Sequence, residues 1–169
     1  MKIKRALVSI YDKTGIIDFI QKLIHLDVEI IASSGTLNFL RESGVQPVNH
    51  VSDITQFPEI LNGRVKTEHP KVIGGILALR NNPEHMDELR KLRIKTIDMV
   101  ICNLHSLQES IGSDLRSTLE HMDIGGLNII RAGIKNFENV VVIVNPEKYN
   151  QVYQELENTG VLVPKQDSA

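Results

Sequence analysis

The sequence predicts an α/β fold of three layers, in which helices cover both faces of a doubly wound, mainly parallel sheet. Four apolar runs of strand length stand out, and they lack the alternation of apolar and polar residues that a half-exposed strand would show. Between these runs lie segments whose apolar residues recur at helical spacing. Strands that alternate with helices are typical of a parallel sheet covered on both faces.

The expected strands are rich in Val and Ile, which suit a buried sheet. In chain order they are Ala6–Ile10, Val28–Ala32, Ile97–Leu104 and Val140–Val144, with a short edge strand near Gln46–His50.

The expected helices follow from apolar spacing and from residues that begin or end helices. Asn82 and Pro83 are typical of a helix start, and Gly160 lies just past the end of the last helix. The predicted helices are Thr14–Leu26, Thr36–Glu42, Pro83–Leu92, Ser113–Met122, Gly126–Lys135 and Pro146–Glu157.

Length and composition limit the kinds of function to consider. The 169 residues predict one domain spanning 1–169. A net charge of −2 gives no overall field that would attract nucleic acid, and Trp is absent, so we expect no nucleic-acid partner. The first apolar run is too short for a signal peptide or a membrane span, so we expect a cytoplasmic protein with no membrane partner.

The cysteine and histidine content argues against a metal site. Cys102 is the only cysteine, which excludes a CxxC site, and its apolar surroundings predict a buried, inert thiol. No two histidines have the spacing of a metal-binding pair. We therefore expect no metal.

Polar clusters follow three of the predicted strands. Asp12-Lys13-Thr14-Gly15 follows the first, Ser33-Ser34-Gly35-Thr36 the second, and Asn103 with His105 the third. The carboxyl ends of parallel strands share one edge of the sheet, where such proteins bind ligands. Each of the first two clusters alone is also explained as a helix cap. Lys13, however, lies where a helix dipole is already positive, which favours an anionic ligand nearby.

The segment Gly63–Pro70 concentrates polar chemistry between a glycine and a proline. It holds Arg64, Lys66, Thr67 and His69, which offer a guanidinium, an ammonium, a hydroxyl and an imidazole. An exposed basic loop without a ligand is the alternative interpretation. The segment is therefore a candidate binding loop for an anion.

A second cluster, Asp123-Ile124-Gly125-Gly126, precedes a predicted helix that ends at Lys135. The two glycines allow close approach of a ligand, or simply a turn of the chain. A cation at a helix end is electrostatically favourable in any protein, so Lys135 also has a structural explanation.

Taken in order, these segments resemble the inosine monophosphate cyclohydrolase domain of the bifunctional purine-synthesis protein, from about Arg5 to Tyr149. That family has the methylglyoxal-synthase-like fold, with Rossmann-type topology. The matching segments are Ala6-Leu7-Val8-Ser9, Asp12-Lys13-Thr14-Gly15, Val51-Ser52-Asp53, Phe57-Pro58-Glu59, Gly63-Arg64-Val65-Lys66-Thr67, His69-Pro70-Lys71-Val72, Gly74-Gly75-Ile76-Leu77, Asn103-Leu104, Asp123-Ile124-Gly125-Gly126, Arg131-Ala132 and Lys135-Asn136.

The resemblance implies an enzyme that closes the purine ring of formamidoimidazole-carboxamide ribonucleotide, with loss of water and without a cofactor. It implies catalytic roles for Lys66, Asp123 and Lys135, with His105 where the family has a tyrosine. The residues expected to bind substrate are Tyr11, Asp12, Lys13, Ser33, Ser34, Gly35, Thr36, Arg64, Val65, Thr67, Cys102, Asn103, Ile124, Gly125 and Gly126.

Several positions depart from the family pattern, notably Tyr11, Ser34, Glu68 and His105. An imidazole titrates near pH 6.5, so a catalytic His105 predicts an added ionisation in the activity profile that His105→Tyr removes. A His105 that points away from the ligand is the alternative.

The departures leave two other functions open. One is a non-catalytic nucleotide-binding or regulatory module of the same fold, and the other is a divergent paralogue that acts on a related ribonucleotide. The expected partners are a small purine ribonucleotide and, functionally, a separate formyltransferase. A homo-oligomer is compatible with the sequence.

Overall fold

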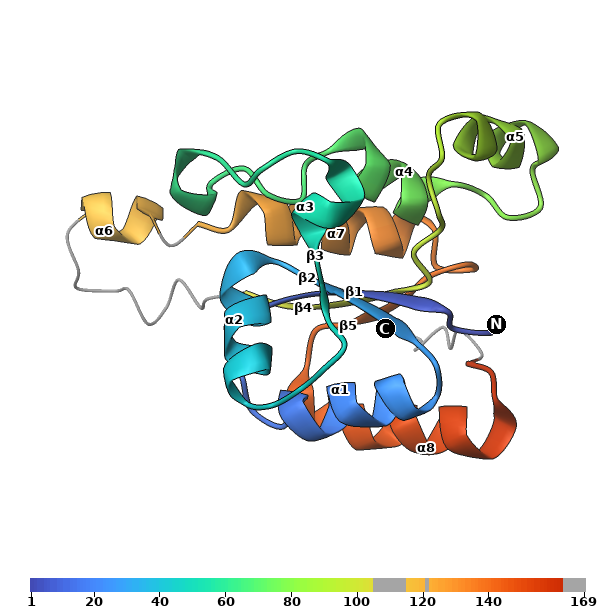
Figure 1. Cartoon of the computed structure of the whole chain (residues 1–169), viewed down its shortest axis with the longest axis horizontal. Coiled ribbons are helices and arrows are strands. Elements are labelled where there is room, and N and C mark those ends of the chain that lie inside the picture. Colours follow the sequence, from blue (N-terminus) through green and yellow to red (C-terminus); the bar gives the residue numbers. More distant parts are fainter. Residues whose placement is uncertain (105–114, 121, 163–169) are drawn as a thin grey trace.

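The computed structural model describes residues 1–104, 115–120 and 122–162. In this part of the chain, five parallel strands form one sheet in the order β3-β2-β1-β4-β5 (Figure 1). The strands are β1 (Arg5–Ile10), β2 (Glu29–Ala32), β3 (Asn49–His50), β4 (Met99–Asn103) and β5 (Val141–Ile143).

Helices cover both faces of this sheet (Figure 1). On one face lie α1 (Ile16–His25), α2 (Ser34–Glu42) and α8 (Tyr149–Thr159). On the other lie α3 (Val51–Thr55), α4 (Pro70–Leu77) and α7 (Ile124–Lys135). The remaining helices are α5 (Pro83–Lys91), α6 (Leu115–Glu120) and the short 3-10 turns η1 (Leu61–Gly63) and η3 (Pro146–Lys148). The predicted three-layer fold is confirmed.

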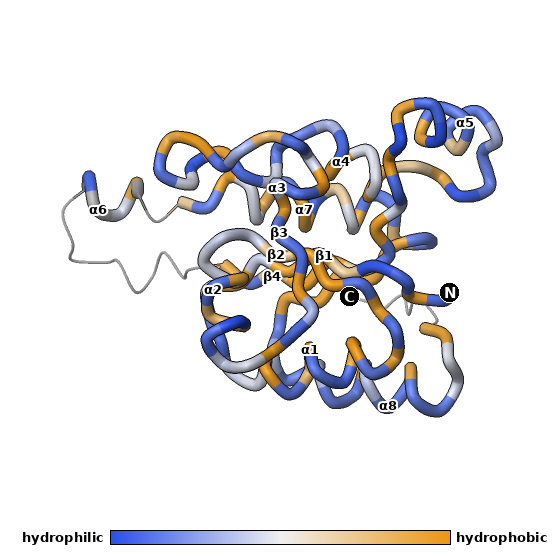
Figure 2. Tube along the Cα trace, in the orientation of Figure 1, coloured by the Kyte–Doolittle hydropathy of each residue, from blue (hydrophilic) through white to orange (hydrophobic). Residues whose placement is uncertain are grey.

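Two apolar clusters, one on each face of the sheet, hold the layers together. Phe19 of α1 and Ile101 of β4 belong to the first, and Ile76 of α4 and Ile129 of α7 belong to the second. Strands and inward helix faces carry the apolar residues, while outer turns are hydrophilic (Figure 2). All six β1 residues are buried, as the absence of alternation in this strand predicted.

The strand register sets the geometry of the carboxyl edge. Ile10 is aligned with Asn103, and Val8 is aligned with Ala32. The polar segments after β1 and β2 and the end of β4 at Asn103 therefore lie beside one another, as the sequence predicted. The chain leaves β1 toward β2 on one side and passes to β4 on the other, so this edge includes the switch point where ligands bind in open α/β sheets.

One predicted helix start and one predicted helix end are confirmed, and two helices were not predicted. Asn82 accepts hydrogen bonds from the Glu84 and His85 amides at the start of α5, and Gly160 ends α8 with a φ of 67°. The prediction missed α3 and α4. At the start of α4, Pro70 occupies the first turn and the His69 imidazole accepts the Lys71 amide.

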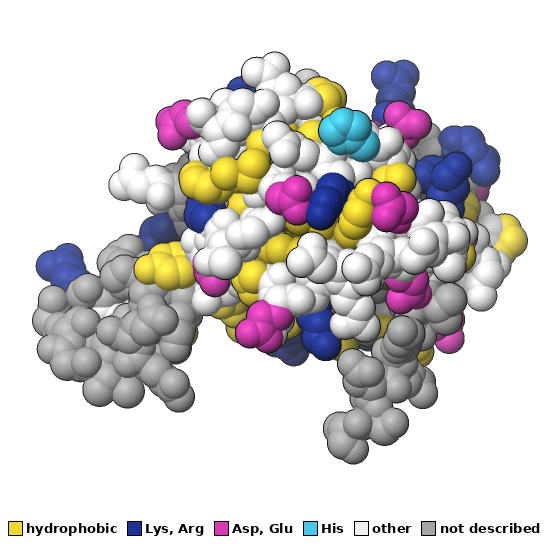
Figure 3. Space-filling model, turned by 90° about the horizontal axis from the view of Figure 1, so that it is seen from below, with side chains coloured by type: hydrophobic (Ala, Val, Ile, Leu, Met, Phe, Trp, Pro, Cys, Tyr) yellow, Lys and Arg dark blue, Asp and Glu magenta, His cyan; other side chains and the backbone are white. Residues whose placement is uncertain are grey.

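None of the helices in the described ranges has the length and apolar character that a membrane span requires. On the face shown in Figure 3, acidic and basic side chains are interspersed among uncharged ones. This pattern agrees with the small net charge and gives that face no field of one sign.

Candidate functional site

Asn103, the last residue of β4, holds the turn that follows β1. Its side-chain oxygen accepts hydrogen bonds from the amides of Tyr11 (2.7 Å) and Asp12 (2.8 Å). Its amide nitrogen donates to the Asp12 carbonyl at 2.9 Å. Asn103 is only 9% exposed, so these bonds lie away from solvent. Asn103 therefore positions the first predicted binding turn rather than pointing freely toward a ligand.

Lys13 follows in that turn, and its ammonium group donates to the Ile10 carbonyl. Its pKa lies below the ordinary lysine value because the side chain is partly removed from water, an effect that nearby Lys66 reinforces and Asp12 opposes. Two cations thus lie near each other at the carboxyl edge. An anionic ligand placed there would relieve both the desolvation and the repulsion.

The start of α2 also attracts negative charge, and Glu59 of the same chain supplies a carboxylate there. The Glu59 carboxylate accepts the Ser34 amide at 2.9 Å, and the Ser34 hydroxyl lies 2.8 Å from the His50 imidazole. His50 and Glu59 are 3.3 Å apart. Ser33 and Thr36 are buried against β1, where Thr36 accepts the Ile10 amide. Gly35 is exposed.

The loop before α4 is held by Glu68, one of the residues that depart from the family pattern. Glu68 accepts the amides of Lys66 (2.7 Å) and Thr67 (2.8 Å) with one carboxylate oxygen. Its other oxygen and the Thr67 hydroxyl are buried with no hydrogen-bond partner among the described residues. Both atoms lie against Gly125, where a Cβ would be 2.9 Å and 2.6 Å away, respectively. The loop and the start of α7 therefore fit only because residue 125 is glycine.

Lys66 and Asp123 meet across this junction. The Lys66 ammonium lies 3.4 Å from the Asp123 carboxylate, and their side chains are 21% and 25% exposed, respectively. Asp123 also caps α7 by accepting the Gly126 amide at 2.9 Å. The carboxylate is thus fixed in place, with one oxygen shared between a cation and a helix start.

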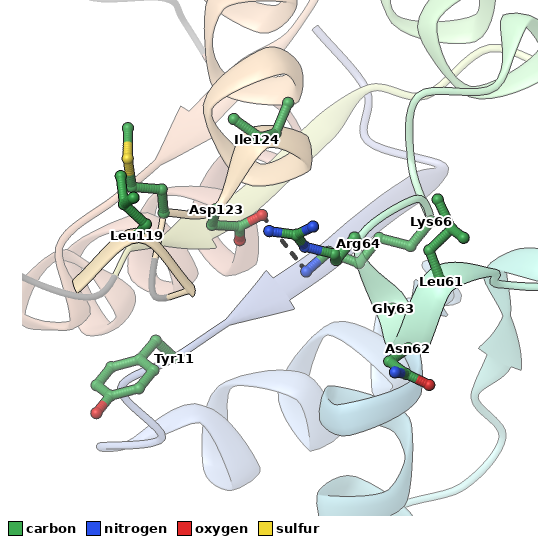
Figure 4. A pocket seen from close by; sticks show the side chains of 10 residues that line it. Tyr11, Leu61, Asn62, Gly63, Arg64, Lys66, Leu119, Asp123 and Ile124 are labelled. Carbon is green, nitrogen blue, oxygen red and sulfur yellow. Dashed lines mark ion pairs between the residues drawn. The ribbon is translucent and has the colours of Figure 1, made fainter. Parts of the chain in front are cut away.

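The pair lies in a cleft of about 720 Å³. In Figure 4 the Arg64 side chain extends into the same region as Lys66 and Asp123, Tyr11 extends from the end of β1, and Ile124 stands on the first turn of α7. The remaining described lining residues are Leu61, Asn62, Gly63, Leu119 and Met122. Within the described residues, no group of His, Cys, Asp and Glu could hold a metal ion.

Several predicted site residues are not among those that line this cleft. The Cys102 thiol is buried in the core, and burial together with Asp123 raises its pKa to about 12, so it does not line the cleft. Lys135 is exposed at the far end of α7 from Asp123, about 18 Å away along the helix axis. His105 lies outside the described residues.

A family model described as the MGS-like domain matches residues 15–128. The chain belongs to this family. The PurH protein of Acetivibrio thermocellus, described as a bifunctional purine biosynthesis protein, is 50% identical over 160 residues, which is 93% of this chain and 31% of that protein. PurH of Caldicellulosiruptor bescii is 47% identical over the same shares. The chain thus spans about a third of the length of these relatives.

A solved structure supports the MGS-like assignment. The crystal structure of ForH matches with a TM-score of 0.85 and 34% identity, covering 94% of this chain and 81% of that one. The fold and the family therefore agree with the resemblance drawn from the sequence.

Within this MGS-like domain, sequence reasoning missed the residues that shape the site through the main chain. Two segments at the carboxyl edge are held by side chains that were not predicted as site residues. The loop before α4 is held by Glu68, and the start of α2 is held by Glu59 and His50. Glu68 was noted only as a departure from the family pattern. A carboxylate next to Lys66-Thr67 was the available signal, because an acidic side chain beside a loop rich in donors has main-chain amides to accept.

Proposed function

We propose that this chain closes the purine ring of formamidoimidazole-carboxamide ribonucleotide, giving inosine monophosphate and water, and that it does so as a single domain. The observation that carries the proposal is the Lys66–Asp123 pair, 3.4 Å apart in the cleft at the carboxyl edge. Similarity to part of PurH, a purine biosynthesis protein, supports a role for this chain in purine biosynthesis.

The reaction needs a proton acceptor and a donor for a developing oxyanion. The carboxamide nitrogen attacks the formyl carbon, and a C–N bond forms while the carbonyl electrons move to oxygen. In our proposal the Lys66 ammonium stabilises that oxygen, and Asp123 accepts the proton from nitrogen. Lys66 then gives a proton to that oxygen, which becomes a hydroxyl. The hydroxyl leaves as water by taking the proton held on Asp123, while the nitrogen that carried the formyl group forms a C=N bond to the same carbon and returns its own proton to Lys66.

The ribonucleotide phosphate is proposed to lie between Lys13 and the start of α2. The first amides of a helix lack intrahelical partners and attract anions. Glu59 already takes the Ser34 amide, which supports an anion position at this helix start. In this proposal the phosphate lies toward Lys13 and Lys66. Burial lowers the pKa of Lys13, and the nearby Lys66 ammonium lowers it further.

The first experiment follows ring closure by ultraviolet absorbance in wild type, Asp123→Asn and Asp87→Asn. The Asp123 variant should lose roughly 100-fold or more in kcat, as expected for a removed general base, with little change in product affinity. The exposed Asp87 on α5 is the matched control and should retain activity. Wild-type turnover in Asp123→Asn contradicts the assigned role.

The second experiment compares binding of inosine monophosphate and inosine. Lys13→Ala should weaken nucleotide binding far more than nucleoside binding, and the exposed Lys2→Ala serves as control. Equal losses for both ligands would remove the phosphate assignment. Tight nucleotide binding with no turnover by wild type would instead favour the non-catalytic module.

A further inference from the structure

Glu59 places a carboxylate at the start of α2, beside the position proposed for the ribonucleotide phosphate. Its Oε1 atom accepts the Ser34 amide at 2.9 Å and lies 3.3 Å from the His50 imidazole. The Glu59 side chain is 13% exposed. The next residue, Ile60, is bonded to Val65 through the main chain in both directions, at 3.1 and 3.4 Å. The carboxylate is therefore fixed through both its side chain and its main chain.

The second carboxylate oxygen of Glu59, Oε2, lies at the edge of the cleft. It has no hydrogen-bond partner among the described residues, whereas Oε1 has two close polar neighbours. A Cβ added to Gly63 would lie 4.0 Å from Oε2, and Gly63 lines the cleft that contains Lys66 and Asp123. Glu59 thus presents negative charge where the start of α2 meets the cleft.

The start of α2 keeps donors for a single phosphate group. The first amides of a helix have no partners within the helix, and Glu59 accepts the first of them in α2. The next two amides, of Gly35 and Thr36, have no hydrogen-bond partner among the described residues. The Lys13 ammonium lies 5.8 Å from the centre of the Phe39 ring in the same helix. Two amides and one cation are thus available for one phosphate, and the amide beside them is already occupied by a carboxylate.

We propose that Glu59 is a specificity-determining residue, which admits a nucleoside monophosphate and rejects the corresponding diphosphate. This role rests on the proposed function for the position of the phosphate. A second phosphate group adds negative charge beyond the first, and it would meet the Glu59 carboxylate in place of a free amide. Like charges placed next to each other strongly disfavour a complex, which is a common source of specificity. The base and ribose are identical in the two ligands, so only the phosphate end can separate them.

Calorimetry measures the binding of inosine monophosphate and inosine diphosphate to wild type, Glu59→Gln and Glu42→Gln, without divalent cations, which would mask phosphate charge. Wild type should prefer the monophosphate by roughly 30-fold or more. Glutamine keeps an oxygen for the Ser34 amide but removes the charge, so Glu59→Gln should narrow this preference by about tenfold, mainly through tighter binding of the diphosphate. Glu42, which is exposed at the opposite end of α2, is the matched control and should keep the wild-type preference.

A measurement on wild type alone covers the case in which Glu59→Gln does not fold. The methyl ester of inosine monophosphate extends past the phosphate without added charge. It should bind more tightly than the diphosphate if charge causes the rejection, and as weakly as the diphosphate if the obstacle is steric.

Equal affinity of wild type for the two nucleotides, an unchanged preference in Glu59→Gln, or rejection of the methyl ester as strong as that of the diphosphate would overturn the role of Glu59. Binding of neither nucleotide would remove the proposed phosphate position together with this role. A wild type that discriminates between the nucleotides but does not cyclise refutes only the catalytic part of the proposed function and supports the role of Glu59.

Discussion

Replacing Gly125 with alanine tests whether the site depends on the close approach of the Lys66–Glu68 loop to α7. The added Cβ would lie 2.6 Å from the Thr67 hydroxyl and 2.9 Å from a Glu68 carboxylate oxygen, both buried. Gly74 in α4 is the matched control, since its Cβ would meet only the ends of Leu89 and Ile94, at 3.8 and 3.9 Å.

We expect Gly125→Ala and Gly74→Ala to change the free energy of unfolding by different amounts. Alanine in place of glycine within a helix stabilises by about 1 kcal/mol, which Gly74→Ala should realise. In Gly125→Ala this gain is offset by overpacking of about 1–3 kcal/mol. Moving Glu68 away would also strain its bonds to two main-chain amides, at 2.7 and 2.8 Å. The two variants should therefore differ in unfolding free energy by roughly 1–3 kcal/mol.

Urea denaturation with a common m-value measures this difference directly. The turnover of Gly125→Ala should also fall, because the displaced loop carries Lys66, which pairs with Asp123 at 3.4 Å. Equal midpoints for the Gly125 and Gly74 variants would show that the loop moves aside freely. Glycine would then not be required at position 125.

Three further changes have definite expected outcomes. Asn103→Ala removes the buried acceptor of two main-chain amides and should cost about 2–4 kcal/mol in denaturation, whereas exposed Asn38→Ala should be near neutral. Gly75→Ala should destabilise, because its Cβ would lie 2.8 Å from the Lys95 carbonyl; wild-type stability there would contradict the contact. Burial raises the Cys102 pKa from 9.0 to about 12, so the folded protein keeps a proton that the unfolded chain loses. Stability should therefore fall above pH 9, by at most about 1.4 kcal/mol per unit, and an unchanged slope in Cys102→Ala would refute this cause.

The sheet could be predicted because burial on both faces leaves a plain signal in the sequence. Val28–Ala32 and Ile97–Leu104 contain the observed β2 and β4 within one or two residues at each end. Few rules govern the order of parallel strands and the handedness of the connections between them. The polar turns could therefore be placed correctly at one edge of the sheet. The helix α4 was missed because Gly74-Gly75 lowers helix propensity, while tertiary contact with Lys95 and Ile97 requires glycine at position 75.

Candidate site residues could be proposed from the sequence, but the geometry that joins them could not. Asp123 was placed before the helix that it caps, and two residues at the start of that helix, Ile124 and Gly125, were left out of the expected range. Which side chain satisfies which amide depends on contacts between distant segments. The bond from Glu59 to Ser34 spans 25 residues and has no local pattern. Such long-range pairings are visible only in the folded chain.

Lys13 shows how the site trades stability against ligand binding. Its pKa is lowered, first because the side chain is partly buried and also because Lys66 is near, so the folded state disfavours the charged form. At neutral pH the charge therefore destabilises the unliganded protein, and this penalty vanishes as pH rises toward the ordinary lysine value. Lys13→Met keeps an apolar side chain of similar length but removes the ammonium, which lies 5.8 Å from the centre of the Phe39 ring. It should unfold at higher urea concentration than wild type while losing its affinity for inosine monophosphate. A variant that is both less stable and unable to bind would mean that the ammonium mainly holds the β1 turn through the Ile10 carbonyl, and that the repulsion between the two lysines is a minor force in this site.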